Sequence, residues 1–241
     1  MPFKSNQFDL DEVYRQLRTN IEFSRMDEGI QVVNTISTNP NEGKSTVAAN
    51  LARVSADKYA RVLLIDCDLR NPTIHRLMGV SNSFGLTNLL ADFDGSMESV
   101  NKAIQSIETD TGKVFYMISS GSRVPNPLEI LSSNRFSKFM SLMRQQFDFI
   151  VIDCPPIGAC SDGVPVSNAS DGTLLIVSSK DTDKRAAKTA SRDLMRAGAN
   201  IIGVVLTKVE NFTNSHYYYY GYGEDGKRKK KSKTKKMKKV K

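Results

Sequence analysis

A short polar segment, residues 37–46, combines residue types that bind phosphate. It reads STNPNEGKST, follows an apolar and β-branched run at residues 32–36, and precedes a helical pattern at residues 44–57. The first N–H groups of a helix have no partner within the helix and carry the positive end of its dipole, so an anion is stabilised there. Glycine allows close backbone approach, lysine supplies positive charge, and serine offers a hydroxyl to Mg²⁺. We therefore expect a nucleotide-binding P-loop with the contact residues Asn41, Glu42, Gly43, Lys44, Ser45 and Thr46.

This loop departs from the usual pattern at one position. The pattern is G-x-x-x-x-G-K-[ST], and Thr38 stands where the first glycine belongs. A Gly-Lys-Ser tripeptide can also occur in a loop by chance. The strand before it and the helix after it favour the nucleotide site.

Three acidic residues, Asp66, Asp68 and Asp153, follow the apolar strands expected at residues 61–65 and 147–152. Ligands of open parallel sheets bind beyond the carboxyl ends of the strands, so these acids could face the nucleotide held by Lys44. A carboxylate at such a position can hold Mg²⁺, and a second one can take a proton from an acceptor hydroxyl. Any single aspartate could instead be a cap or turn residue. We expect ATP and Mg²⁺ as cofactors, with Lys44 and the three acids as catalytic residues.

An acceptor hydroxyl is available in the chain itself. Five of the eight tyrosines, Tyr217, Tyr218, Tyr219, Tyr220 and Tyr222, lie in a segment flanked by glycines. A tyrosine hydroxyl has a pKa near ~10, so it must lose its proton during phosphoryl transfer. The alternatives are a low-complexity tail, or aromatic stacking on nucleic acid beside lysine–phosphate contacts.

The net positive charge of the chain comes from its end. The net charge is +8, and residues 227–241 carry ten lysines and one arginine without an acid, which leaves residues 1–226 at −3. Such a block repels itself and is typical of a disordered tail. It could be a solubilising terminus, attract an anionic membrane surface, or bind nucleic acid, which we regard as the weaker interpretation.

The remaining patterns predict an α/β fold. Apolar strands at residues 114–118, 173–178 and 201–206 alternate with helices at residues 128–146 and 184–197. This alternation is typical of a mainly parallel sheet flanked by helices, a P-loop NTPase-like three-layer sandwich. We expect an N-terminal helical segment at residues 1–28, a nucleotide-binding domain at 29–210 and a flexible tyrosine and lysine tail at 211–241. The N-terminal residues do not form a signal peptide, and no apolar run approaches the ~20 residues needed to span a bilayer. The three cysteines form no C-x-x-C pair. We therefore expect a cytoplasmic protein.

Taken together, these motifs make residues 9–222 resemble the bacterial tyrosine kinases of capsule and exopolysaccharide operons, the CpsD/CapB type. The resemblance is carried by Glu12-x-x-Arg15-x-x-Arg18, Pro40-x-Glu42-Gly43-Lys44-Ser45, Asp66-x-Asp68-x-Arg70, Pro125-Asn126-Pro127-Leu128-Glu129-Ile130-Leu131, Asp153-x-Pro155-Pro156 and the tyrosine cluster. In that family the loop typically lacks the first glycine.

The resemblance implies specific roles for the motif residues. Lys44 would contact the β- and γ-phosphates, and Asp66 would be the base for the incoming tyrosine. The metal ligands would be Ser45, Asp68 and Asp153. The tyrosines of the cluster would be phosphorylated between subunits.

It also implies partners. Glu12, Arg15 and Arg18 would form contacts between subunits of a ring, although charges at this spacing are more often a solvated helix face. A separate transmembrane modulator would hold the protein at the inner face of the membrane and complete its active state. Thr207 and Lys208 stand where relatives often carry asparagine, a departure at the position of adenine contacts.

The main alternative is a MinD/ParA-like ATPase that switches on nucleotide binding without kinase activity. Such proteins usually carry a signature lysine one residue after the first motif position, where this chain has Asn39. The tyrosine cluster is also unexplained by that alternative.

Overall fold

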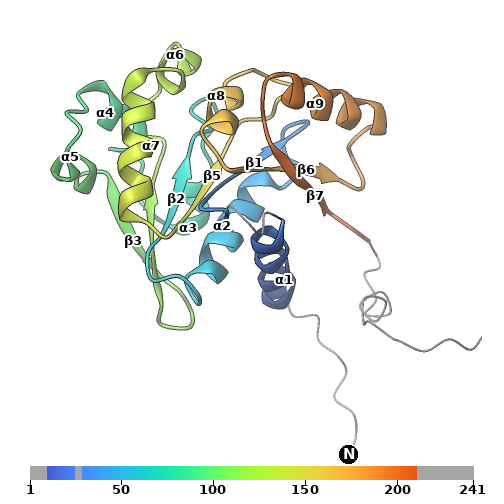
Figure 1. Ribbon diagram of the computed structural model, residues 1–241, viewed down its shortest axis with the longest axis horizontal. Helices are drawn as coiled ribbons and strands as arrows, with labels where there is room; N and C mark the ends of the chain where they lie inside the picture. Colours follow the sequence, from blue (N-terminus) through green and yellow to red (C-terminus); the bar gives the residue numbers. More distant parts are fainter. Residues whose placement is uncertain (1–9, 25–28, 211–241) are drawn as a thin grey trace, which may run out of the picture. The chain divides into compact units, whose positions relative to one another are not determined.

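The part of the chain that the structure describes contains one sheet of seven strands in the order β3-β4-β2-β5-β1-β6-β7 (Figure 1). The structure is a computed structural model and describes residues 10–24 and 29–210. All neighbouring strands are parallel except β3 and β4, which pair antiparallel at one edge. The strands are β1 (Val32–Ser37), β2 (Val62–Asp66), β3 (Ile104–Glu108), β4 (Val114–Ile118), β5 (Phe149–Asp153), β6 (Gly172–Ser178) and β7 (Ile201–Thr207).

The central strands are buried along their whole length, which explains their apolar sequences. Every residue of β1, β2 and β5 is buried, as expected of parallel strands covered on both faces. The register places Asp66 beside Asp153 and Thr35 beside Asp153. Three polar side chains are thus brought together at the carboxyl edge of the sheet.

One face of the sheet is covered by three helices, α1 (Leu10–Phe23), α2 (Lys44–Ser55) and α3 (Ile74–Met78). Tyr14 and Ile21 of α1 are buried in this layer with Val47 and Leu51 of α2. The first helix therefore belongs to the same compact unit as the nucleotide-binding fold, which extends from Asp9 to Glu210.

The opposite face carries the other helices (Figure 1). Its core joins Leu86 and Leu89 to Phe136 and Phe139, and Leu194 packs farther along the sheet. With the first layer, this confirms the predicted α/β three-layer architecture. The helices are α4 (Leu86–Ala91), α5 (Met97–Asn101), α6 (Pro127–Leu131), α7 (Asn134–Gln146), α8 (Gly163–Asn168) and α9 (Lys184–Arg196).

One local expectation was wrong, and one strand was not expected. The single helix expected at residues 128–146 is divided into α6 and α7. The Ser133 hydroxyl accepts a hydrogen bond from Phe136 N at 3.2 Å, so a new N-cap starts α7. Strand β3 was not expected, because its partly exposed sequence has no apolar run and forms a strand only through antiparallel pairing with β4.

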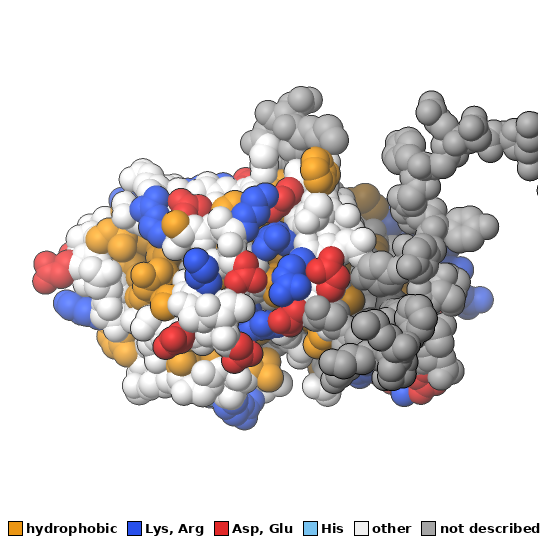
Figure 2. Space-filling model, turned by 90° about the horizontal axis from the view of Figure 1, so that it is seen from below, with side chains coloured by type: hydrophobic (Ala, Val, Ile, Leu, Met, Phe, Trp, Pro, Cys, Tyr) orange, Lys and Arg blue, Asp and Glu red, His pale blue; other side chains and the backbone are white. Residues whose placement is uncertain are grey.

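Some expectations lie outside the described residues, namely the tyrosine cluster and the lysine tail. Within residues 10–24 and 29–210, no helix has the length and apolar character needed to cross a bilayer. Acidic and basic side chains are interspersed on the face of the body shown in Figure 2. Attraction to an anionic surface thus stays a prediction about the tail.

Candidate functional site

The phosphate-binding loop connects β1 to α2 and has two residues in left-handed backbone conformations. Asn41 has φ 62° and Gly43 has φ 92°. A Cβ at Gly43 would lie 3.4 Å from Cγ2 of Thr207, so glycine suits both the conformation and the space. Thr38 has no positive φ, and the position of the missing glycine therefore makes no conformational demand for one. The helix begins at Lys44, with its first N–H groups at the loop.

Glu42 holds the loop from within. Its side chain is almost completely buried and accepts hydrogen bonds from Thr38 N at 2.8 Å and Asn39 Nδ2 at 3.2 Å. The hydroxyl of Thr182, which lies 140 residues away in the chain, also donates to this carboxylate. Thr207 Oγ1 donates to the Glu42 carbonyl oxygen at 2.6 Å. The position of Glu42 therefore suits support of the loop rather than side-chain contact with a ligand.

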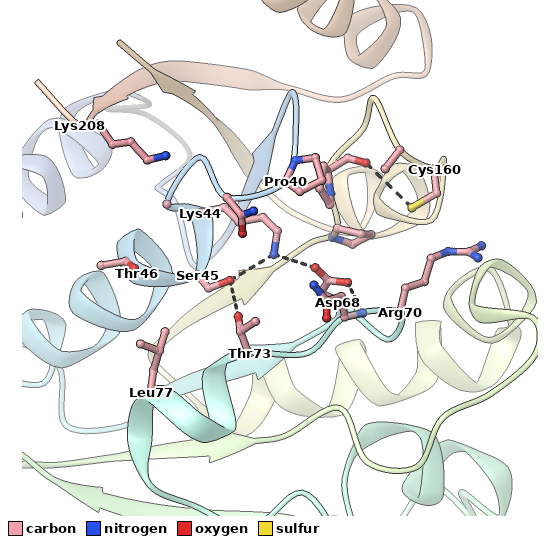
Figure 3. A pocket seen from close by; sticks show the side chains of 16 residues that line it. Pro40, Lys44, Ser45, Thr46, Asp68, Arg70, Thr73, Leu77, Cys160 and Lys208 are labelled. Atoms are coloured by element: carbon pink, nitrogen blue, oxygen red, sulfur yellow. Dashed lines mark hydrogen bonds and ion pairs between the residues drawn. The ribbon is translucent and has the colours of Figure 1, made fainter. Parts of the chain in front are cut away.

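Lys44 lies between two carboxylates in front of the sheet edge. Its Nζ is 2.8 Å from Oδ2 of Asp68 and 3.2 Å from Oδ2 of Asp153 (Figure 3). Burial acts to lower the pKa of Lys44, but the charges of Asp153 and Asp68 outweigh it and raise the pKa. The ammonium group is thus fully charged and is held where an entering phosphate would compete for it.

The hydroxyl of Ser45 completes a polar cluster with Asp153. Ser45 Oγ donates to Asp153 Oδ2 at 2.5 Å, and Thr73 Oγ1 donates to Ser45 Oγ at 3.0 Å. Thr35 Oγ1 donates to the other oxygen of Asp153 at 3.2 Å. Among the described residues no three His, Cys, Asp or Glu side chains form a ready-made metal cage. Mg²⁺ at phosphate sites commonly takes one or two carboxylates together with phosphate and water, so this donor set fits it.

Asp66 ends β2 and Asp68 lies two residues farther along the chain, and both are buried. Asp68 lines the cleft, whereas Asp66 has no exposed surface. Asp66 Oδ1 accepts a hydrogen bond from Asp68 N at 3.1 Å. Burial, and then the charge of Asp153, raise the pKa of Asp66 to about 8. A carboxyl group with such a pKa holds its proton at neutral pH in the free protein.

These groups face a cleft of about 470 Å³. Figure 3 shows Lys44 near its middle, Lys208 and Thr46 toward one end, and Arg70 and Cys160 toward the other. Its other lining residues are Pro40, Asn41, Gly43, Ser45, Asp68, Asn71, Thr73, Leu77, Pro155, Pro156 and Ala159.

Several supporting residues were missed by sequence reasoning. Arg70 Nη2 donates to Oδ1 of the buried Asp162 at 3.0 Å, which ties the loop after β2 to the loop after β5. Thr73 and Thr182 contact the site from segments outside the motifs. No local pattern marks such residues, since their partners are distant in sequence. Arg70 was named as part of the Asp66-x-Asp68-x-Arg70 motif, but its partner Asp162 was not.

The candidate interface residues lie on α1 and do not line the cleft. Arg18 Nη1 donates to the Val54 carbonyl oxygen of α2 at 2.6 Å. Glu12 and Arg15 form an ion pair with each other at 3.4 Å, and the Glu12 side chain is 62% exposed. Arg18 is thus used within the fold, whereas Glu12 lies on its surface.

Comparison with known proteins agrees with this site. A family model described as an AAA domain matches residues 32–183. The chain is 37% identical to a tyrosine-protein kinase of Bacillus subtilis, YwqD, over 86% of this chain and 84% of the relative. It is 33% identical to a putative tyrosine-protein kinase of Staphylococcus aureus, CapB, over 87% of this chain and 89% of the relative.

Solved structures give the same result. The kinase domain of the Escherichia coli tyrosine kinase ETK matches with a TM-score of 0.75 and 32% identity, covering 88% of this chain and 80% of that one. The cell division ATPase MinD of Pyrococcus furiosus matches with a TM-score of 0.56 and 25% identity, over 73% of this chain and 71% of that one. The fold is therefore shared with MinD and supports nucleotide binding. The chain itself belongs to the bacterial tyrosine-protein kinases, as its motifs predicted.

Proposed function

We propose that this protein transfers the γ-phosphoryl group of ATP to tyrosine hydroxyls, including those of its own C-terminal cluster. The observation that carries the proposal is the placement of Lys44 between Asp68 and Asp153 at the start of α2. A phosphate at the helix start would meet free N–H groups and this ammonium group together. Because the chain belongs to the tyrosine-protein kinases, we take tyrosine hydroxyls as the acceptors of the phosphoryl group.

The polar cluster assigns roles to the groups around the phosphates. Lys44 would turn from the two carboxylates to the β- and γ-phosphates, leaving Asp68 and Asp153 to balance a cation. Ser45, Asp68 and Asp153 would hold Mg²⁺, which supplies charge neutralisation on the transferring oxygens when it is bound. The contact of Ser45 Oγ with Asp153 at 2.5 Å supports this ligand set.

In the transfer step, Asp66 would take the proton of the tyrosine hydroxyl. The tyrosine oxygen then forms the new bond to the γ-phosphorus, the bond to the bridging oxygen breaks, and ADP leaves. Asp66 can do this only in its charged form, so the proton that it holds in the free protein at neutral pH must leave before the transfer step. Asp66 has no exposed surface and does not line the cleft, so the groups around it must shift when the acceptor enters.

We propose that contacts between copies in a ring involve Glu12, Arg15 and Arg18. We also propose that a transmembrane modulator is the partner that completes the active state at the membrane. The relatives named for capsule loci support a role in capsular or exopolysaccharide synthesis. Attraction of the tail, residues 227–241, to anionic lipid would reinforce this location.

The test of the kinase is incubation with ATP and Mg²⁺, with the modulator's cytoplasmic segment present, followed by mass spectrometry of the tail. We expect phosphate on residues 217–222 of the native chain and none on Lys44→Met. Continued ATP hydrolysis without tyrosine phosphate would favour the MinD-like ATPase instead.

A mixing experiment tests transfer between subunits. Lys44→Met keeps the acceptors and loses the phosphate contact, whereas a chain with its five C-terminal tyrosines changed to phenylalanine keeps the site and loses the acceptors. We expect the mixture to carry phosphate on the Lys44→Met chain. Phosphate on neither chain, with a native chain that is active alone, would show that each copy phosphorylates its own tail.

A further inference from the structure

Helix α9 carries a row of basic side chains, whereas both signs of charge are mixed on the face shown in Figure 2. The members of the row recur at intervals of three and four residues, so they share one side of the helix. All four are exposed, and we call them the basic stripe: Arg185, Lys188, Arg192 and Arg196.

The fold turns the basic stripe away from the sheet. Ala190 and Leu194, on the opposite side of the helix, are buried. The start of the helix is fixed by Asp183, whose side chain accepts hydrogen bonds from Arg185 N at 2.8 Å and Ala186 N at 3.0 Å. Figure 1 shows α9 at the end of the sheet that β6 and β7 form. The stripe is therefore a fixed row on the outside of the molecule.

Little of the charge of the stripe is neutralised by neighbouring acids. Within residues 10–24 and 29–210, the one carboxylate that forms an ion pair with a stripe residue is that of Asp193. It lies 3.9 Å from Arg196 Nη1, and both side chains are largely exposed. An exposed pair of this kind contributes little, so the stripe keeps its charge available for a partner.

The other residues that precede the lysine tail are acidic on balance. Residues 1–226 carry a net charge of −3, although α9 holds five basic residues and one acid. Outside α9, this part of the chain therefore carries −7. An anionic surface is attracted by the stripe and repelled by the remainder, which favours one orientation of the protein.

The described chain ends close to the start of α9. Glu210 forms an ion pair with Lys180, and Ser179 N donates to the Thr207 carbonyl oxygen at 2.9 Å. Lys180 and Ser179 come shortly before α9 in the chain. Residues 211–226 would span up to about 50 Å if extended. The lysine tail beyond them can thus reach the same surface as the stripe.

We propose that the basic stripe binds the headgroups of anionic phospholipids, so that the body itself contacts a membrane surface. A lipid surface can meet all four side chains at once, because they lie along one line of the helix. Met195 is 55% exposed and lies on the flank of the stripe, three residues after Arg192, where it can enter the apolar layer beneath the headgroups. Nucleic acid offers phosphates but no such layer. This contact adds to the attraction expected of the tail and does not depend on phosphoryl transfer.

Vesicle partitioning of the full-length chain tests this contact. The vesicles contain phosphatidylglycerol and phosphatidylcholine in equal parts, or phosphatidylcholine alone, at about 0.1 M salt, and co-sedimentation measures the bound fraction. The stripe variant has all four stripe residues changed to glutamine. A control variant loses the same charge through glutamine at four exposed basic residues of other segments, Lys102, Lys113, Arg123 and Lys138. The tail is intact in every protein, so its contribution is common to all of them.

The native chain should bind the anionic vesicles and not the neutral ones. The stripe variant should lose at least about tenfold in partition coefficient, because each basic residue near such a surface contributes up to about fivefold. The control variant should lose less than about threefold, since it changes the net charge without removing the contact. Equal midpoints of urea unfolding show that both variants are folded.

Equal losses in the two variants would overturn the proposal, because binding would then follow net charge alone. Failure of the native chain to bind the anionic vesicles would overturn it as well. The same proteins are titrated with a DNA duplex and with polyglutamate. A stripe variant that lost affinity only for one of these polyanions would make the partner nucleic acid or an acidic protein segment, and the lipid contact would be excluded.

Discussion

Asp66 is a buried carboxyl group whose pKa is set by its surroundings. It is completely covered, yet it lies beside the ammonium group of Lys44 and accepts the N–H of Asp68. Burial opposes its charged form, and Asp153 adds further repulsion, so its pKa is raised to about 8. The free protein therefore keeps a proton on this carboxyl group at a pH where an exposed aspartate has lost it.

This environment predicts the pH dependence of an Asp66→Asn variant. In the native chain the unfolded state loses the Asp66 proton near pH 3.8 and the folded state near pH 8. The stability from this proton is present below pH 3.8 and is lost as pH rises to 8. Asp66→Asn lacks this loss, so its free energy of unfolding relative to the native chain should rise between pH 5 and pH 8.5. Urea unfolding at both pH values checks this, and an unchanged or falling difference would contradict the raised pKa.

At the scale of one element, the phosphate-binding loop works without its first glycine because another residue supports it. Glu42 joins Thr38, Asn39 and Thr182 through a single buried carboxylate. The Thr38 carbonyl also lies 2.5 Å from where a Cβ at Gly158 would stand, so the loop after β5 approaches closely. The loop is therefore shaped by its contacts as much as by its own sequence.

Replacement of Glu42 by alanine should destabilise the protein by about 2–4 kcal/mol, because buried donors lose their acceptor. It should also weaken nucleotide binding, although the Glu42 side chain does not line the cleft. Urea unfolding and calorimetric titration with the β,γ-imido analogue of ATP measure the two effects. Glu42→Gln keeps one acceptor oxygen and is the control. A loss of affinity in Glu42→Ala without a loss of stability would instead indicate a direct ligand contact.

At the scale of the whole molecule, the first helix is part of the folded body. Its Ile21 is 2% exposed, and its Arg18 donates to the Val54 carbonyl oxygen of α2. Glu22 accepts hydrogen bonds from Lys58 at 2.6 Å and from the Tyr59 hydroxyl at 2.9 Å. Of the three charged residues expected at one interface, Arg18 therefore contacts α2 within the fold, whereas Glu12 and Arg15 form an ion pair at the surface.

This division predicts separable effects on stability and assembly. Arg18→Ala should lower the free energy of unfolding by about 1–2 kcal/mol, because it removes a charged hydrogen bond and packing against α2. The double change Glu12→Ala and Arg15→Ala should alter stability by less than about 0.5 kcal/mol, since its ion pair is largely exposed. If these two residues join copies in a ring, the double variant should sediment as smaller species. Unchanged sedimentation at matched concentration would remove them from the interface.

Much of the fold could be predicted from local sequence. The apolar runs at β1, β2 and β5 and the periodic stretch at α2 identified buried strands and the helix behind the phosphate loop, because burial on both faces requires continuous apolar sequence. The division of one expected helix into α6 and α7 was missed, since the serine cap of Ser133 competes with an otherwise helical pattern. Strand β3 was missed because its pairing partner, not its own composition, makes it a strand.

The sequence by itself determined the residue types of the site: a lysine and a serine at the start of a helix, acids after strands, and tyrosines near the end of the chain. Only the tertiary structure decided their relations. The strand register placed Asp66 beside Asp153. Of the two acids at the end of β2, only Asp68 lines the cleft. Loops far apart in sequence brought Thr182 to Glu42 and Asp181 to Lys208. The physical reason is that motif spacing reports neighbours along the chain, whereas burial, pKa and hydrogen bonding depend on neighbours in space.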